Sequence, residues 1–337
     1  MRNIKKALLG AVLTLILIVG VQAVVRCCYE DWDLVVRNSK TSRKELEGTL
    51  DTLYCGTSLT YHMFMPNLLD KIMGTNSFNL GTGGQPYIGS YYLIRETAEK
   101  NPIEQIYLVV SLASLIKGET ADAAYLSGYE YLNSWKWKLA YLLDVKKEDV
   151  WTAALLYSTQ VEEYFDLRQV KENLLYKYVD VTYSASYDKR GYRGTKKEYM
   201  GRAATRNTDR NYWEKKLGEE QIQEEAYEYL EKIVEFCREK GIHLTLVIPP
   251  FTQDYLDGAG AIEEFQKYIA QKAENWNVEL FDFMRYKERE TLFTNDKFKD
   301  SFHMNNAGAK AFGYLLAEIE QSDDPQGYFN EIDESED

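Results

Sequence analysis

The sequence predicts an α/β fold built around a parallel sheet. Short apolar segments recur along the chain, and each is followed at once by glycine, serine or other turn residues, which is typical of buried parallel strands. Amphipathic stretches with helical spacing lie between some of these segments, as the crossover connections of a parallel sheet require. With 337 residues, the chain is long enough for one large domain that carries an insertion.

The N-terminus has the pattern of a membrane anchor. Arg2, Lys5 and Lys6 precede an apolar run at residues 7–25 that contains no charged side chain. At a rise of about 1.5 Å per residue, such a run spans most of the hydrocarbon core of a bilayer. Basic residues before the run keep the N-terminus inside the cell, so residues 1–6 are predicted to be cytoplasmic and the remainder to be extracytoplasmic.

The apolar segment can be either a cleaved signal peptide or a retained anchor. A cleaved signal peptide would give a secreted protein, and Val21-Gln22-Ala23 has the small-residue spacing that signal peptidase reads. The length of the apolar run favours a retained anchor, which makes the chain a single-pass protein of the plasma membrane. Residues 26–50 are charged and mostly polar, and they are predicted to be a stalk or first helix before a domain at 51–321.

Five segments of that domain are predicted to be strands, because each is short, apolar and followed by turn residues. They are residues 52–55, 77–80, 105–111, 243–248 and 278–281. Buried strands of this kind pair in parallel when helices connect them, so the five are expected to form one sheet.

The clearest helix is predicted at 219–240, where one apolar stripe repeats at helical spacing and Gly241 follows as a C-cap. It leads directly into the fourth strand, as a crossover helix should. A final helix is predicted at 307–319. Residues 322–337 are acidic and interrupted by proline, so they are predicted to be a disordered tail.

A segment of about a hundred residues separates the third strand from the helix at 219, and it is rich in tyrosine and tryptophan. Residues 116–218 are therefore predicted to be a helical insertion over the C-terminal edge of the sheet. Its aromatic residues suit either a carbohydrate-binding surface or the core of the insertion. The later part, 189–216, is locally basic and suits either an anionic polymer or a solvated loop.

The composition excludes several classes of function. The chain has 53 acidic and 40 basic residues and a formal net charge of −13, which argues against nucleic acid as a partner. Its four cysteines suggest no disulfide framework. The three histidines show no metal-ligand spacing, so no metal site and no cofactor are predicted.

Two short segments that lie far apart in the chain supply the parts of an acyl-transfer triad. Ser58 stands at the tip of the small-residue turn after the first strand, and Asp300 and His303 lie three residues apart near the C-terminus. They offer a serine nucleophile, a histidine base and an aspartate that orients the base. His303 is preferred over His62, which lies on the helix after the serine, and over His243, which lies at the wrong end of its strand.

Three blocks in this order resemble those of the SGNH (GDSL-like) hydrolase superfamily. They are Gly56-Thr57-Ser58, the glycine block at 78–85, and Asp300-Ser301-Phe302-His303. With the anchor, the chain resembles the membrane-anchored acyltransferase-like branch that includes the teichoic-acid D-alanylation protein DltD and the alginate O-acetylation proteins. The resemblance implies a flavodoxin-like three-layer α/β/α fold with a parallel sheet and a helical insertion.

The resemblance also implies roles for residues around the serine. The backbone N–H groups of Ser58 and Gly81 are expected to form an oxyanion hole, and Gln85 is expected to contact the substrate. Thr57 replaces the family's aspartate, and no Gly-x-Asn-Asp block follows the third strand. Ser111 is therefore the candidate for the missing third donor.

Three functions are consistent with these expectations. The first is an O-acyltransferase that moves an acetyl or D-alanyl group through a serine ester to a cell-envelope or secreted polymer, with a multipass membrane O-acyltransferase as its partner. The second is an esterase or deacetylase of the same fold, in which water replaces the acceptor. The third is a non-catalytic protein that binds a polymer or a partner. The intact serine, histidine and aspartate favour the two enzymatic functions.

Overall fold

The computed structural model describes residues 2–29, 34–116, 122–161, 166–178, 187–201, 223–259 and 262–331. A five-stranded parallel sheet with the order β2-β1-β3-β4-β5 lies at its centre. The strands are β1 (Thr52–Cys55), β2 (Ser77–Asn79), β3 (Gln105–Val109), β4 (His243–Ile248) and β5 (Glu279–Asp282). The prediction of an α/β fold with a parallel sheet is confirmed, and the strand order is the flavodoxin-like one.

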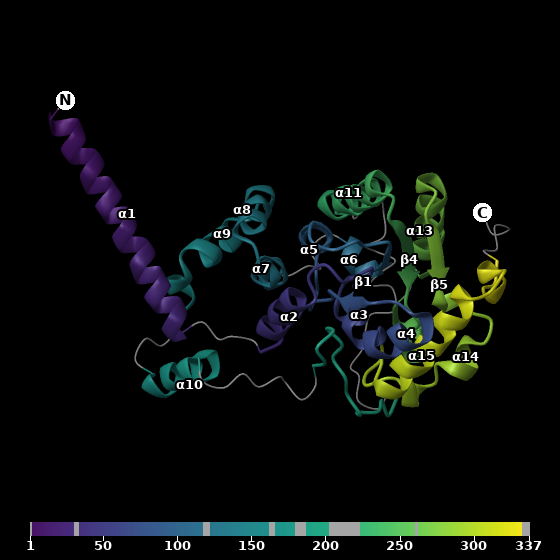
Figure 1. The fold of residues 1–337 in the computed structure, drawn as a ribbon. Coiled ribbons are helices and arrows are strands. Elements are labelled where there is room, and N and C mark those ends of the chain that lie inside the picture. Colours follow the sequence, from purple (N-terminus) through teal and green to yellow (C-terminus); the bar gives the residue numbers. More distant parts are fainter. Residues whose placement is uncertain are drawn as a thin grey trace.

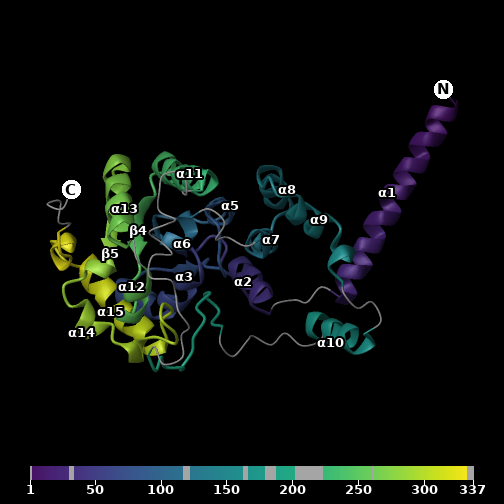
Figure 2. The same ribbon diagram turned by 180° about the vertical axis from the view of Figure 1, so that it is seen from behind.

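Helices cover both faces of the sheet, as Figures 1 and 2 show. The side chains of each strand alternate, so Leu53 and Cys55 enter one hydrophobic core and Tyr54 enters the other. The first core includes α5 (Tyr87–Ala98), α11 (Glu224–Lys240) and α13 (Ile262–Trp276), and the second includes α3 (Ser58–Met63), α4 (Pro66–Met73) and α15 (Asn306–Glu320). The three-layer α/β/α arrangement follows from this division.

The insertion is helical in its described residues up to 178. It contains α7 (Asp122–Tyr131), α8 (Trp135–Asp144), α9 (Glu148–Leu155), the 3₁₀ helix η1 (Tyr157–Gln160) and α10 (Leu167–Tyr178), after the short α6 (Leu112–Leu115). The hydroxyl group of Tyr141 donates to the Tyr125 carbonyl at 2.7 Å, and both rings are buried. At least these aromatic residues therefore form the core of the insertion.

The basic segment expected at 189–216 lies within the described residues only up to 201. There Arg190 pairs with Asp70 at 3.3 Å and its carbonyl accepts from the Asn79 N–H at 2.8 Å. Gly191 packs so closely on this strand that an added Cβ would lie 2.1 Å from the Asn79 carbonyl oxygen. This part of the segment therefore covers the edge of β2.

The segment expected to be a stalk is packed against the domain. Residues 34–45 form α2 (Leu34–Glu45), and Arg43 on this helix makes a buried ion pair with Glu96 at 3.1 Å. The same guanidinium donates to the Tyr131 carbonyl. A buried arginine needs such partners, because an unpaired charge is costly to remove from water. The alternative of a first helix is therefore the one that the structure shows.

The C-terminal segment differs from the expected disordered tail as far as it is described. The 3₁₀ helix η7 (Pro325–Tyr328) leads to Phe329, whose ring stacks on Phe281 with centroids 5.8 Å apart. The Asn330 N–H donates to the Arg285 carbonyl at 2.9 Å. Residues 322–331 therefore cover the end of β5, and the rest of the predicted tail, 332–337, lies outside the described residues.

The remaining elements are the N-terminal helix and four short helices near the C-terminal half of the sheet. They are α1 (Arg2–Tyr29), α12 (Gln253–Ala259), α14 (Arg289–Leu292), η5 (Phe283–Arg285) and η6 (Asn295–Lys297). In the described part of the chain, α1 is the one helix that is long and apolar enough to cross a membrane. Figure 1 shows it extending away from the sheet, with its N-terminus far from the domain.

A buried carboxylate at the end of β5 makes stability depend on pH. Burial raises the pKa of Asp282 to about 6 from its ordinary 3.8, although Gln266 and the Met284 N–H donate to it and Arg285 lies nearby. Between pH 3.8 and about pH 6, Asp282 binds more protons in the folded chain than in the unfolded chain. Protonation of Asp282 therefore stabilises the fold fully below about pH 3.8, and this stabilisation is lost as the pH rises through about 6.

Asp282→Asn is expected to remove this contribution, because asparagine does not titrate and the Gln266 amide can rotate to accept from it. Urea midpoints at pH 5 and pH 7.5 test this. The difference in stability between the two pH values should change in Asp282→Asn and stay as in the wild type in the control Glu264→Gln, an exposed site on α13. Equal differences in all three proteins would contradict the assignment.

Candidate active site

The turn that carries Ser58 is built by its neighbours. Gly56 follows β1 with φ of 134°, and a Cβ there would lie 2.6 Å from the Thr60 hydroxyl and 3.1 Å from Val109. Thr57 is the N-cap of α3, and its hydroxyl accepts from the Leu59 N–H at 3.3 Å. Ser58 is thus the first residue of a capped helix at the C-terminal end of β1, and it remains half-exposed.

The loop that carries Asp300 and His303 is closed by Asn305. The buried Asn305 side chain caps α15 by accepting from the Ala307 and Gly308 N–H groups, and its amide donates to the Phe298 carbonyl at 3.1 Å. This one residue therefore ties the loop to the helix behind it. Sequence reasoning missed Asn305, although an asparagine just before a helical stretch is a recognisable N-cap signal.

The structure brings the three predicted residues together in one relay. His303 Nε2 lies 2.7 Å from Ser58 Oγ, and His303 Nδ1 lies 2.9 Å from Asp300 Oδ2. A carboxylate only accepts, so Nδ1 carries the proton and Nε2 is left to accept from the serine hydroxyl. This is the tautomer that a general base for Ser58 needs.

Asp300 is held ionised beside the histidine. Burial raises the pKa of this carboxyl, but the hydrogen bond from the His303 ring, the charge of that ring, and the N–H groups of His303 and Phe302 outweigh burial and lower the pKa to about 2. The carboxylate is therefore charged throughout the physiological range. It can orient the imidazole and stabilise an imidazolium.

The three expected oxyanion donors differ in whether another group of the protein already occupies them. The Ser58 N–H makes no hydrogen bond within the described residues. Gly81 does not fill its expected role, because its N–H already donates to Asn79 Oδ1 at 3.0 Å. The glycine is needed there for packing, since an added Cβ would lie 2.9 Å from the Thr57 carbonyl oxygen. Ser111 lies at the site, and its hydroxyl is 2.7 Å from that of Ser114.

Gln85 is not where substrate contact would require it. Its side chain is buried, and its amide donates to the Ser90 hydroxyl at 2.8 Å rather than facing the nucleophile. The glycines before it, Gly83 and Gly84, line the cavity beside Ser58 instead. Within the described residues neither of their N–H groups is paired, so both are available near the serine.

A cavity of about 560 Å³ opens beside the serine. Its aromatic wall consists of Phe251, Tyr255 and Phe302, with the Phe302 ring 4.1 Å from that of His303. The remaining lining residues are small or apolar, among them Leu59, Ala113, Ser114, Ala123 and Ala124. Such a cavity suits a small acyl group.

A second bond joins the two elements of the relay. His62 lies one helical turn after Ser58, and Lys299 lies four residues before His303; the Lys299 ammonium donates to His62 Nε2 at 2.7 Å. His62 Nδ1 donates to the Arg193 carbonyl at 2.8 Å, which leaves Nε2 as the acceptor. Burial, the Lys299 charge and His303 lower the pKa of His62 to about 3, so it is a neutral acceptor.

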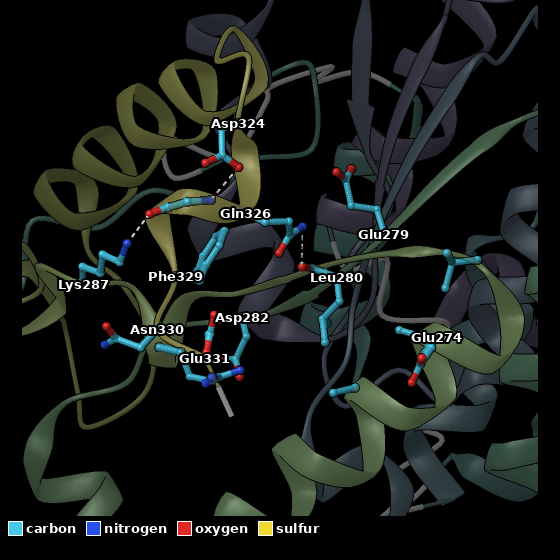
Figure 3. A pocket seen from close by; sticks show the side chains of 15 residues that line it. Glu274, Glu279, Leu280, Asp282, Lys287, Asp324, Gln326, Phe329, Asn330 and Glu331 are labelled. Atoms are coloured by element: carbon cyan, nitrogen blue, oxygen red, sulfur yellow. Dashed lines mark hydrogen bonds between the residues drawn. The ribbon is translucent and has the colours of Figure 1, made fainter. Parts of the chain in front are cut away.

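A larger cavity of about 900 Å³ lies beside β5, between α13 and the C-terminal segment. Figure 3 shows its polar lining, which includes Glu274, Glu279, Asp282 and Lys287. It shares no lining residue with the cavity beside Ser58, and no serine, cysteine or histidine lines it. It therefore offers no serine or cysteine nucleophile and no histidine base for acyl chemistry.

Within the described residues, no group of three or more histidine, cysteine, aspartate or glutamate side chains is placed to bind a metal ion.

No protein-family model matches the sequence, and no curated protein matches it. Similar solved structures include a proposed acylhydrolase from Bacteroides fragilis NCTC 9343, with 10% identity, a TM-score of 0.40, and coverage of 86% of this chain and 96% of that one. A GDSL-like lipase from Bacteroides thetaiotaomicron VPI-5482 has 10% identity, a TM-score of 0.38, and coverage of 85% and 97%. At this level of similarity, the assignment of the site depends on its own geometry.

We predict that Lys299→Met and His62→Phe each lower kcat for hydrolysis of an activated acetyl ester by about 10- to 100-fold, with little change in KM. Either change removes the bond that holds the His303 loop against the Ser58 helix. The double variant should lose no more activity than the single ones, because all three lack the same bond. Its thermal midpoint should recover relative to that of His62→Phe, in which the Lys299 ammonium is left without this acceptor.

Lys297→Met is the matched control, because Lys297 pairs with Asp296 and not with His62. Additive losses in the double variant, or a loss confined to KM, would mean that this bond does not position the base.

Proposed function

We propose that this chain is an extracytoplasmic, membrane-anchored serine O-acyltransferase of the SGNH type. It moves an acyl group, acetyl or D-alanyl, through an ester on Ser58 to a hydroxyl of a cell-envelope or secreted polymer. The observation that carries the proposal is the continuous relay from Ser58 Oγ through His303 to Asp300. That relay suits acyl transfer through a covalent serine ester.

The first half-reaction forms the ester. His303 Nε2 takes the proton of Ser58 as Oγ attacks the acyl carbonyl carbon of the donor. The tetrahedral intermediate collapses, the bond to the donor's leaving group breaks, and His303 returns the proton to that group. In the second half-reaction, His303 takes a proton from the acceptor hydroxyl as its oxygen attacks the carbonyl carbon of the Ser58 ester. The bond between that carbon and Ser58 Oγ then breaks, and His303 returns the proton to Oγ.

Negative charge on the carbonyl oxygen needs N–H donors in both steps. The Ser58 N–H is beside the attacking oxygen, and the Gly83 and Gly84 N–H groups lie on the wall of the same cavity. Ser111 remains a candidate for a further donor through its hydroxyl group. One missing donor costs about 10²–10³-fold in rate, so a hole with fewer donors is slow but active.

The proposed location follows from α1. Its basic N-terminus would stay in the cytoplasm and the domain would lie outside the plasma membrane. A tether holds an enzyme near a donor that emerges at the membrane, and the second proposed partner is a multipass membrane O-acyltransferase that exports the acyl group. A hydrolase of soluble esters has no such need for a tether.

Hydrolysis by the same residues is the second candidate function. Ser58 is half-exposed, and its cavity opens to solvent, so water can reach a Ser58 ester. Transfer then depends on an acceptor hydroxyl that competes with water in the second step.

Partitioning of an activated acetyl ester separates these functions in the full chain reconstituted in lipid nanodiscs. A transferase should release one equivalent of leaving group in a burst, accumulate acetyl-Ser58, and turn over faster when a polysaccharide acceptor is added. Ser58→Ala should reduce release to the uncatalysed background, because it removes the attacking oxygen. Ser134→Ala, which changes a serine of the insertion that does not line this cavity, should keep the burst.

Steady turnover that the acceptor does not change would identify an esterase. Release in the wild type no faster than in Ser58→Ala would contradict both enzymatic proposals and favour a binding protein.

A further inference from the structure

The exposed apolar side chains outside α1 are concentrated on the insertion. In the described part of the chain, ten large apolar side chains after α1 are exposed, and seven of them lie between residues 135 and 175. They are Trp135, Leu139, Leu143, Leu155, Leu156, Leu167 and Leu175. Apolar residues gathered in this way on a surface mark an interaction site more often than scattered ones do.

Helix α8 presents the most regular part of this surface. Trp135, Leu139 and Leu143 are spaced by four residues, so they lie on one face of the helix, and they are 77%, 48% and 64% exposed. The opposite side of α8 is already packed, since Trp137 and Tyr141 are buried against the domain. The exposed stripe is therefore additional to the face that holds α8 in place.

Polar contacts join the insertion to the C-terminal end of α1, near the point where this helix would leave the bilayer. Gln22, which lies inside the apolar run, donates to the Ser158 hydroxyl at 2.7 Å and accepts from the Ser158 N–H at 2.9 Å. Lower on the same helix, the Cys28 carbonyl accepts from Asn173 at 3.1 Å. Since Gln22 is three residues from the end of the run, η1 lies at the level where α1 would leave the bilayer.

The direction of α8 agrees with this placement. Figures 1 and 2 both show α9 and α8 rising from the lower end of α1, so that α8 lies level with part of that helix. The helix that carries the apolar stripe therefore lies on the bilayer side of the lower end of α1.

We propose that α8 is a second membrane contact, which seats the insertion on the surface of the bilayer that α1 crosses. Trp135, Leu139 and Leu143 enter the interfacial layer of the lipid. Tryptophan is enriched at this depth, and an amphipathic helix lies in the interface with its apolar face in the lipid. This inference rests on the proposed membrane location of α1, but not on the chemistry of Ser58.

A second membrane contact restricts the orientation of the domain. A single transmembrane helix leaves the domain free to rotate about that helix and to tilt. With α8 also held in the interface, the domain has a fixed orientation, and the cavity beside Ser58 stays at a defined height above the lipid. A donor presented at the membrane surface would then meet the nucleophile in a constant geometry.

Tryptophan quenching by brominated phosphatidylcholine tests the inference in the full chain reconstituted in vesicles. Flotation of the vesicles in a density gradient first shows whether the chain is anchored. Trp135→Phe is then expected to remove about half or more of the lipid-dependent quenching, because Trp135 is the tryptophan placed in the interface. Trp276→Phe, a buried residue of α13, should leave the quenching as in the wild type.

The outcomes separate the anchor from the second contact. If the chain floats but Trp135→Phe changes nothing, and aqueous iodide reaches Trp135, the stripe faces water and the inference is wrong; a protein partner would then be the ligand of this surface. If the chain does not float, the proposed anchor fails and this inference fails with it. Fluorophosphonate labelling of Ser58 is independent of either result.

Discussion

Ser58 and His303 are separated by 245 residues in the chain, and the hydrogen bond between them forms only while two separately built turns stay in place. One turn leaves β1 through Gly56, whose backbone conformation and close neighbours leave no room for a side chain. The other is closed by Asn305. The proposed activity depends on this alignment, because a displacement of about 1 Å is enough to cost a base its function.

The sheet explains why two such distant turns can meet. Parallel strands end at one edge, so the loops after β1, β3 and β4 converge there. Thr252, in the loop after β4, donates through its hydroxyl group to the Ser301 carbonyl at 2.7 Å and so supports the second turn. The Lys299–His62 bond adds a direct contact between the two elements. The loop that carries His303 is thus held by contacts with the loop after β4 and with α3.

Local pattern was sufficient to predict the strands and the residues of the relay. Each strand is a short apolar segment, so its own side chains are enough to predict that it is buried. Ser58, Asp300 and His303 are recognisable by their chemistry and by their order in the chain. Gly81 could not be assigned correctly, because its N–H is taken by the side chain of a residue two positions earlier, Asn79. A backbone donor can be judged only when its acceptors are known.

The other differences have the same origin. Arg43 lies in a polar segment that suggested a stalk, but Glu96 and the Tyr131 carbonyl, both far away in the sequence, stabilise it in a buried position. Phe329 follows an acidic stretch typical of disorder, yet it stacks on Phe281 of β5. His62 was considered only as a candidate base. The contact that matters for it is the hydrogen bond from Lys299, which the sequence does not indicate. Each of these contacts joins distant segments and leaves no local signal.

The most direct test of the account is peptide mapping by mass spectrometry after the folded full chain reacts with a fluorophosphonate. One adduct is expected, on the peptide that contains Ser58, and it should be absent in Ser58→Ala, slow to form in His303→Ala and unchanged in Ser134→Ala, a serine outside the cavity. An adduct on another serine, or none on the folded protein, would show that Ser58 is not an activated nucleophile and would contradict the central claim.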